Sequence, residues 1–155
     1  MLADFGLSRT KHGLSGWSSS VHGWSEHYVS PEVLNGNMDA SVSSDIWSFG
    51  MVIYMAFTGR TPYTQEYPNP IAAQTAIRNS NPPRKPPFNI TDMRRGFTND
   101  VWGFLEQHCW QKMARNRPSA RDCSRRLEAL RVRWRSQNIA PSSEVSILQI
   151  TESLC

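Results

Sequence analysis

The 155-residue sequence has few cysteines, no long apolar run and no recognisable targeting signal. Its three cysteines (Cys109, Cys123 and Cys155) are odd in number and show no paired spacing, which argues against a disulfide framework or a zinc site. No apolar stretch reaches the roughly 20 residues that a membrane-spanning helix needs. The first residues lack a basic stretch followed by an apolar core, so no secretory signal is predicted. A reducing, cytoplasmic location is therefore the default expectation.

Acidic residues are scarce in one stretch of the C-terminal half. The stretch from Lys112 to Arg135 holds nine of the seventeen basic residues, and only Asp122 and Glu128 oppose them. Such a stretch can bind nucleic acid or anionic lipid. The commoner explanation is a solvated, arginine-rich face of a terminal helix. We therefore do not expect nucleic acid as the main partner.

The sequence does contain one unusually apolar stretch, residues 42–57. After Asp45 nearly every residue is apolar or small, so a helix drawn through the stretch is predicted to be buried on all sides. Its length would be about 24 Å, roughly the width of a small domain. Gly59 suits a left-handed cap, and Pro62 cannot continue the helix. We expect this stretch to be the central helix of a mainly α-helical domain.

The remaining elements are predicted from local signals. Residues 1–9 are typical of a short strand that ends in a turn, and residues 10–27 form a long loop rich in glycine and serine. Ser30 and Pro31 are typical of a helix start. Further helices are predicted at residues 71–77, 98–110 and 119–134. From residue 136 we expect a loose tail, in which the apolar segment 145–150 docks as either a strand or a helix.

Residues 80–87 contain four prolines and are predicted to be irregular. Pro83 and Pro86 have the spacing of a minimal ligand for a proline-reading domain. An ordered connecting loop explains the same residues and is the more frequent case.

Four short motifs occur in a fixed order: Asp4-Phe5-Gly6, Ser30-Pro31-Glu32, the run from Asp45 to Gly50, and Arg117-Pro118-Ser119. Each motif alone is weak, but the four together at these spacings are specific. From residue 1 to about residue 134 the sequence resembles the C-terminal half of a protein kinase domain. The resemblance is to the serine/threonine type, within the tyrosine-kinase-like group. It implies a mainly α, kinase-like C-lobe around helix 42–57, with a partial domain at residues 1–135 and a tail at 136–155.

The resemblance assigns roles to the first motif. Asp4 would hold the Mg²⁺ ion that bridges the phosphates of ATP, a task for which hard oxygen ligands are suited. Phe5 would pack beneath the active site, and Gly6 would let the backbone turn. ATP and Mg²⁺ are therefore the cofactors expected of the complete domain.

Residues 4–32 would form the activation segment, which in this family is often controlled by phosphorylation. Ser25 stands where serine/threonine kinases place the hydroxyl that contacts the catalytic aspartate. Tyr28 stands where a tyrosine-specific enzyme typically has tryptophan, which favours the serine/threonine type. One departure from the family pattern is Trp24, which replaces the usual glycine before Ser25. The candidate phosphorylation sites are the loop serines Ser15, Ser18, Ser19 and Ser20.

Four further residues are expected to support the fold. The resemblance implies that Glu32 and Arg117 form a buried ion pair, and a guanidinium offers the two-pronged match that a carboxylate prefers. Asp45 would accept backbone hydrogen bonds from the catalytic loop, and its place at a helix N-terminus is favourable in any case. Trp47 would lie in the core.

Most of the catalytic parts of a kinase are missing from these 155 residues. The sequence has no glycine-rich loop, no third-strand lysine with its partner glutamate, and no His-Arg-Asp catalytic loop. Either Met1 is not the true start of the protein or the chain is a shortened remnant. We expect the chain alone to be inactive, to bind little or no Mg²⁺-ATP, and to expose apolar surface.

Two functions follow from this reading. The first is a serine/threonine protein kinase represented by its C-terminal half, with protein substrates. The second is a non-catalytic remnant that acts as an interaction module. The expected partner is either the missing half of the kinase domain or another protein that covers the apolar surface.

Overall fold

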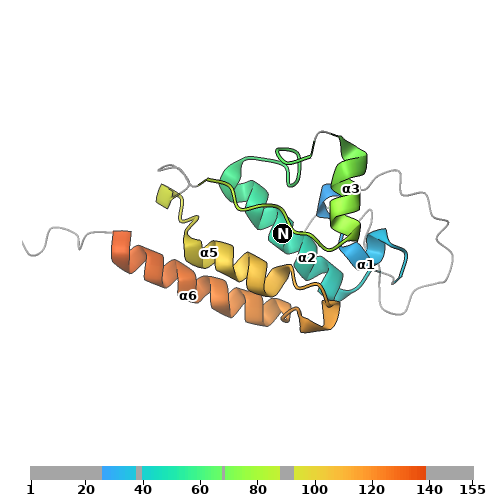
Figure 1. Cartoon of the computed structure of the whole chain (residues 1–155). Helices are drawn as coiled ribbons and strands as arrows, with labels where there is room; N and C mark the ends of the chain where they lie inside the picture. The colour runs from blue at the N-terminus through green and yellow to red at the C-terminus, as the bar shows by residue number, and fades with distance from the viewer. Residues whose placement is uncertain (1–25, 38–39, 68, 88–92, 139–155) are drawn as a thin grey trace, which may run out of the picture.

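The computed structural model describes residues 26–37, 40–67, 69–87 and 93–138. Within these ranges the regular structure is helical, which agrees with the predicted mainly α fold; the strand predicted at residues 1–9 lies outside them. The elements in chain order (Figure 1) are η1 (Glu26–Tyr28), α1 (Pro31–Leu34), α2 (Val42–Thr58), α3 (Pro70–Arg78), α5 (Asn99–Phe104), the π-helical turn η2 (Leu105–Cys109), η3 (Ala114–Asn116) and α6 (Ala120–Asn138).

Helix α2 is the predicted central helix, and its ends have clear chemical causes. Ser41 is the N-cap: its side chain accepts a hydrogen bond from the backbone N–H of Ser44, and the Ser44 side chain accepts one in return. This reciprocal arrangement satisfies two amide groups that the first turn leaves free. At the other end Gly59 adopts the left-handed conformation (φ 66°) and donates its N–H to the carbonyl of Met55 at 2.8 Å. The helix therefore stops where the glycine was predicted to stop it.

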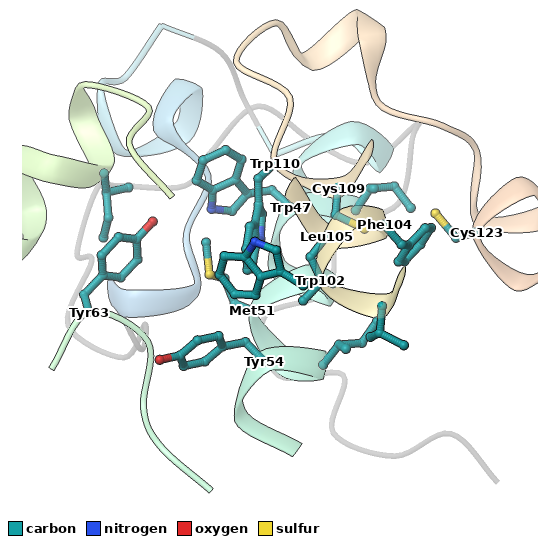
Figure 2. Packing of buried hydrophobic residues seen from close by; sticks show 14 of the residues in the cluster. Trp47, Met51, Tyr54, Tyr63, Trp102, Phe104, Leu105, Cys109, Trp110 and Cys123 are labelled. Atoms are coloured by element: carbon teal, nitrogen blue, oxygen red, sulfur yellow. The ribbon is translucent and has the colours of Figure 1, made fainter. Parts of the chain in front are cut away.

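One side of α2 packs against α5 and η2 to form the core. Trp47, Met51 and Tyr54 lie on this side, facing Trp102 and Trp110 (Figure 2). The indoles of Trp102 and Trp110 pack edge to face with ring centroids 5.5 Å apart. Aromatic pairs in this geometry contribute beyond the apolar area that they bury.

Gly50 allows α2 to approach this core closely. A β-carbon built on Gly50 would lie 2.6 Å from Nε1 of Trp110 and 2.9 Å from the β-carbon of Cys109. Both distances are shorter than van der Waals contact, so a larger residue would force the helices apart. The close packing of α2 against Cys109 and Trp110 thus explains why a glycine stands at position 50.

The opposite side of α2 is exposed, so the prediction that the helix is buried on every face is wrong for the described residues. Val42 is 58% exposed, Val52 49%, Met55 41% and Phe49 38%. The described elements touch this side only in part: the Tyr28 hydroxyl of η1 contacts Met55, and α6 flanks Val42 and Phe49. The apolar surface expected of an incomplete domain is therefore present, and it lies on α2.

The two predicted C-terminal helices are present with altered ends. The helix predicted at residues 98–110 is capped by the side chain of Thr98, and it changes from α-helical to π-helical at Leu105. Helix α6 is capped by Ser119, whose side-chain oxygen accepts from the N–H of Asp122 at 3.2 Å, and it continues to Asn138. It rests on the core through Cys123, Leu127 and Leu130. Ala120, the first residue of α6, is exposed.

Residues 81–87 connect α3 to the C-terminal helices without regular structure. Pro83 and Pro86 are both buried. A proline-reading domain needs these rings on the surface, so the connecting-loop interpretation is the correct one. Among the described residues, no helix is long and apolar enough to span a membrane.

Candidate functional site

A buried ion pair joins two segments that are 85 residues apart in the sequence. The Arg117 guanidinium donates one hydrogen bond to Oε1 of Glu32 at 2.6 Å and a second to Oε2 at 2.9 Å. The Arg117 side chain is fully buried, and that of Glu32 is 10% exposed. The structure thus brings together the two residues that the sequence paired, in the two-pronged geometry that suits a guanidinium and a carboxylate.

Two further N–H groups of Arg117 are also used. Its Nε donates to the carbonyl of Gln111 at 3.0 Å, and one terminal nitrogen also donates to the carbonyl of Ser43 at 3.0 Å. The guanidinium carbon lies 5.1 Å from the ring centroid of Trp47, which is itself completely buried. A buried charge is tolerated only when such partners replace its lost hydration. Trp47 is therefore a core residue that also contacts the buried cation.

Ser44 connects this ion pair to the start of α2. Its hydroxyl donates to Oε1 of Glu32 at 3.2 Å, while its backbone is part of the capping box with Ser41. Sequence reasoning missed Ser44 as a site residue. The available signal was a pair of serines three residues apart at a helix start, which is the spacing of a capping box.

The described end of the predicted activation segment is anchored to α2 and α3. The Tyr28 hydroxyl donates to the sulfur of Met55 at 2.7 Å, and Ser48 donates to the carbonyl of Tyr28 at 2.8 Å. Gln74 of α3 donates to Oε2 of Glu26 at 2.6 Å. These three contacts fix the 3₁₀ turn η1 on two helices, so the chain from residue 26 to the ion pair has a defined position.

Electrostatics favours the charged form of Glu32. Burial acts to raise the pKa of its carboxyl, but the hydrogen bonds and the positive charge of Arg117, together with a backbone hydrogen bond, outweigh burial and lower that pKa below its ordinary value of 4.5. The ion pair is therefore fully charged at neutral pH.

Asp45 lies in the first turn of α2, next to Ser44. Its surface is exposed, although neighbouring atoms exclude part of its hydration and raise the pKa of the carboxyl. Within the described residues Asp45 forms no ion pair, and its predicted contact with a catalytic loop stays a prediction.

The predicted metal-binding and substrate-side residues Asp4, Phe5, Gly6 and Ser25 lie outside the described residues, as do the candidate phosphorylation sites Ser15, Ser18, Ser19 and Ser20. Within the described residues, no group of three or more histidine, cysteine, aspartate or glutamate side chains is placed to hold a metal ion.

The structure thus places a central helix, an anchored segment before it and a buried arginine after it. Residues 1–127 match the protein kinase domain family, and the chain belongs to that family. Complete domains of this family use ATP and Mg²⁺.

Individual members of this family show which kinases the chain is similar to. The chain is 32% identical over 127 residues to receptor-interacting serine/threonine-protein kinase 3 of Rattus norvegicus, an alignment that covers 79% of this chain and 26% of the relative. It is 36% identical over 118 residues to a probable serine/threonine-protein kinase of Dictyostelium discoideum (76% of this chain, 12% of the relative). It is 27% identical over 130 residues to a mitogen-activated protein kinase kinase kinase of Drosophila melanogaster (83% and 10%). The predicted resemblance to serine/threonine kinases is confirmed, and the chain spans about a quarter or less of these three relatives.

Proposed function

We propose that this chain is the C-terminal part of a serine/threonine protein kinase domain, which in its complete form transfers the γ-phosphoryl group of ATP to hydroxyl groups of protein substrates. The observation that carries the proposal is the ion pair between Glu32 and Arg117, with the contacts of Ser44 and Trp47 around it. Kinase chemistry depends on positioning and charge stabilisation, so a segment that borders the active site must be held rigidly. The described contacts hold residues 26–34 in that way.

The 155 residues alone are proposed to be inactive. They contain no glycine-rich loop, no third-strand lysine and no catalytic loop, and Asp4 is the only residue of the usual catalytic set. These parts act together, so removing most of them removes phosphoryl transfer and not merely a fraction of it. In an assay with ATP, Mg²⁺ and a general protein substrate, we expect no transfer above the buffer control.

A chimeric domain tests whether this chain can complete an active serine/threonine kinase domain. The segment of rat receptor-interacting serine/threonine-protein kinase 3 that precedes its matched region is joined to this chain, and the product is offered peptides that differ only in carrying serine, threonine or tyrosine. We expect phosphorylation of the serine and threonine peptides. A folded chimera, with a cooperative thermal transition, that phosphorylates none of the peptides or only the tyrosine peptide would contradict the proposal.

A second function, a non-catalytic interaction module, is supported by the exposed apolar side of α2. Val42, Phe49, Val52 and Met55 form a surface on one helix where either the rest of a kinase domain or another protein would bind. If the chain binds the separately produced upstream part of a kinase domain, the surface completes a domain. If the chain instead binds an unrelated protein, and that protein prevents the upstream part from binding, the interaction-module function is favoured.

The arginine-rich region is not proposed as a nucleic-acid site. Arg117 is buried with Glu32, and three exposed arginines contact acidic side chains: Arg125 with Asp122, Arg131 with Glu128, and Arg133 with Asp100. Phosphate binding would have to compete with these pairs. Retention on nucleic acid that falls steeply with salt would contradict this view.

A further inference from the structure

Ser136 lies in the last turn of α6, and its side chain is exposed to solvent. Its hydroxyl donates a hydrogen bond to the backbone carbonyl of Arg133 at 2.7 Å, a contact that stays within the helix. Residues 135–138 are all exposed, and at this end α6 projects past the start of α5 (Figure 1). Helix ends with few outside contacts fray, so this hydroxyl is accessible to an enzyme.

Arginines precede Ser136 at three positions, one, three and five residues before it: Arg135, Arg133 and Arg131. No acidic residue stands between Glu128 and Ser136. Protein kinases distinguish substrates partly by charge pattern, and a groove lined by carboxylates attracts arginines and pairs with them in two-pronged geometry. The residues before Ser136 therefore suit a kinase whose substrate groove is acidic.

We propose that Ser136 is a phosphorylation site for an arginine-directed serine/threonine kinase, and that the phosphate draws Arg133 away from Asp100 of α5. The proposal goes beyond the kinase assignment of this chain and does not depend on it, because the modifying enzyme is a separate protein. In the transfer, the Ser136 oxygen attacks the γ-phosphorus of ATP, and the bond from that phosphorus to the β–γ bridging oxygen breaks. ADP leaves, and the hydroxyl proton passes to the carboxylate base of the modifying kinase.

An active site can surround the Ser136 hydroxyl only if the end of α6 unwinds. Unwinding from Arg133 onwards breaks its ion pair with Asp100, whose two side chains are 63% and 51% exposed. It also releases the indole N–H of Trp134 from the carbonyl of Met93, a hydrogen bond of 3.3 Å. Exposed ion pairs contribute little to stability, so this local opening costs much less than global unfolding.

Ser124 provides a comparison within the same helix. Arg121 stands three residues before it, and the Ser124 side chain is also exposed. Unwinding α6 around Ser124 would pull Cys123, which is 1% exposed, and Leu127 out of their contacts with the core. We therefore expect the fold to protect Ser124 from the modifying kinase, although an arginine stands at the same spacing.

A phosphate on Ser136 would compete with Asp100 for Arg133. Near neutral pH a phosphoserine carries a charge of about −1.5 to −2, whereas the Asp100 carboxylate carries a single negative charge. Arg133 is three residues from Ser136 on the same helix, a spacing at which side chains meet. The phosphate also adds negative charge at the C-terminal end of α6, where the helix dipole disfavours it. Phosphorylation should thus loosen the contact between α6 and α5.

Phosphorylation of the full 155-residue chain in vitro tests the site. The chain is incubated with ATP, Mg²⁺ and a purified serine kinase that requires arginine three residues before its target, and the modified residues are located by mass spectrometry. Free peptides covering residues 129–138 and 120–129 give the rates at the two serines without folded structure. We expect Ser136 in the chain to react within about tenfold of its peptide, and Ser124 at least about a hundredfold more slowly than its peptide.

Two variants separate recognition from unwinding, because both break the ion pair between Arg133 and Asp100. Arg133→Gln removes the arginine that the modifying kinase binds, and it should lower kcat/KM at Ser136 at least about tenfold, which corresponds to about 1.4 kcal/mol. Asp100→Asn removes only the partner of that arginine, so kcat/KM should stay the same or rise. Equal rates in the parent and Arg133→Gln, or equal losses in the two variants, would overturn the proposal. So would a chain that is modified at Ser124 as readily as its peptide or is not modified at Ser136.

Hydrogen exchange of the phosphorylated chain tests the effect on Arg133. Amides of residues 131–138 should exchange about fivefold faster than in the unmodified chain. Amides of α3, which lies far from this end of α6 (Figure 1), are the internal standard and should not change. In Asp100→Asn, where the ion pair is already absent, phosphorylation should accelerate exchange less. Unchanged or slower exchange of residues 131–138 in the phosphorylated parent would overturn the release of Arg133 from Asp100.

Discussion

Two regions of this molecule use the same chemical pair, arginine with a carboxylate, in opposite surroundings. At the start of α2, Arg117 and Glu32 are enclosed by Trp47, Ser43 and Ser44. Along α6, Arg131 and Glu128 form a pair one helical turn apart whose side chains are half exposed to water. The first pair connects residues far apart in the sequence, whereas the second connects neighbours on a helix that is already formed.

The comparison shows that burial and sequence separation, more than the pair itself, determine what an ion pair does. Water screens the exposed pair, and its loss leaves two charges that water can solvate. Loss of one partner in the buried pair leaves a charge without hydration or counter-ion. The predictions below test this difference, beginning with the change expected to have the largest effect.

Arg117→Ala should have the largest effect. The substitution leaves the Glu32 carboxylate buried without its partner and removes the hydrogen bonds to the carbonyls of Gln111 and Ser43. We expect the free energy of unfolding to fall by about 3–5 kcal/mol, measured by chemical denaturation. Arg115→Ala, which removes an exposed arginine two residues away, is the control and should change little. Equal losses for the two variants would contradict the account.

Acidification should have the next largest effect, through Glu32. Because the folded state lowers the pKa of this carboxyl, its contribution to stability is complete above its ordinary value of 4.5 and is lost as the pH falls through the lower folded value. Thermal midpoints of the parent chain and of Glu32→Gln, measured across this range, should differ most at neutral pH and converge in acid. A difference that stays constant with pH would show that the charge of Glu32 contributes nothing.

Ser44→Ala should have an intermediate effect. It removes a hydrogen bond to Glu32 and one half of the capping box, while the guanidinium contacts remain. We expect a loss of about 1–2 kcal/mol in the free energy of unfolding. Ser43→Ala is the matched control, because only the backbone carbonyl of Ser43 is used in the ion-pair network. A Ser43 variant less stable than the Ser44 variant would contradict this assignment.

Glu128→Gln should have the smallest effect. The exposed pair with Arg131 holds the pKa of Glu128 below its usual value, but both groups are open to solvent. Exposed helix pairs of this kind contribute little and are screened by salt. The thermal midpoint should match that of the parent within error at physiological salt. A loss comparable to that of Arg117→Ala would remove the distinction between the two regions.

The sequence predicted the parts of the fold that depend on local signals. Gly59 ends α2 as predicted, and the helices predicted at residues 98–110 and 119–134 begin within a few residues of their observed starts. The pairing of Glu32 with Arg117 came from the family resemblance, because nothing local connects positions 85 residues apart. The π-helical turn at Leu105–Cys109, which packs against α2, was not predicted, because its residues carry no distinctive local signal.

The same reasoning could not predict contacts that depend on how helices meet. The hydrogen bond from Gln74 to Glu26 and that from Tyr28 to the sulfur of Met55 arise only after α2 and α3 are placed. The prediction that α2 is buried on all sides was wrong, because an apolar composition shows only that a helix is favoured to pack against other residues. It does not report whether the covering residues are present.

A double-mutant cycle on Glu32 and Arg117 tests the central claim most directly. The free energies of unfolding of the parent, Glu32→Ala, Arg117→Ala and the double variant are compared. The account predicts that each single variant loses several kcal/mol and that the double variant is no less stable than either single one, because the second substitution removes a charge already unpaired. If the two losses simply add, the pair is not coupled, and it cannot be what holds residues 26–34 against α2.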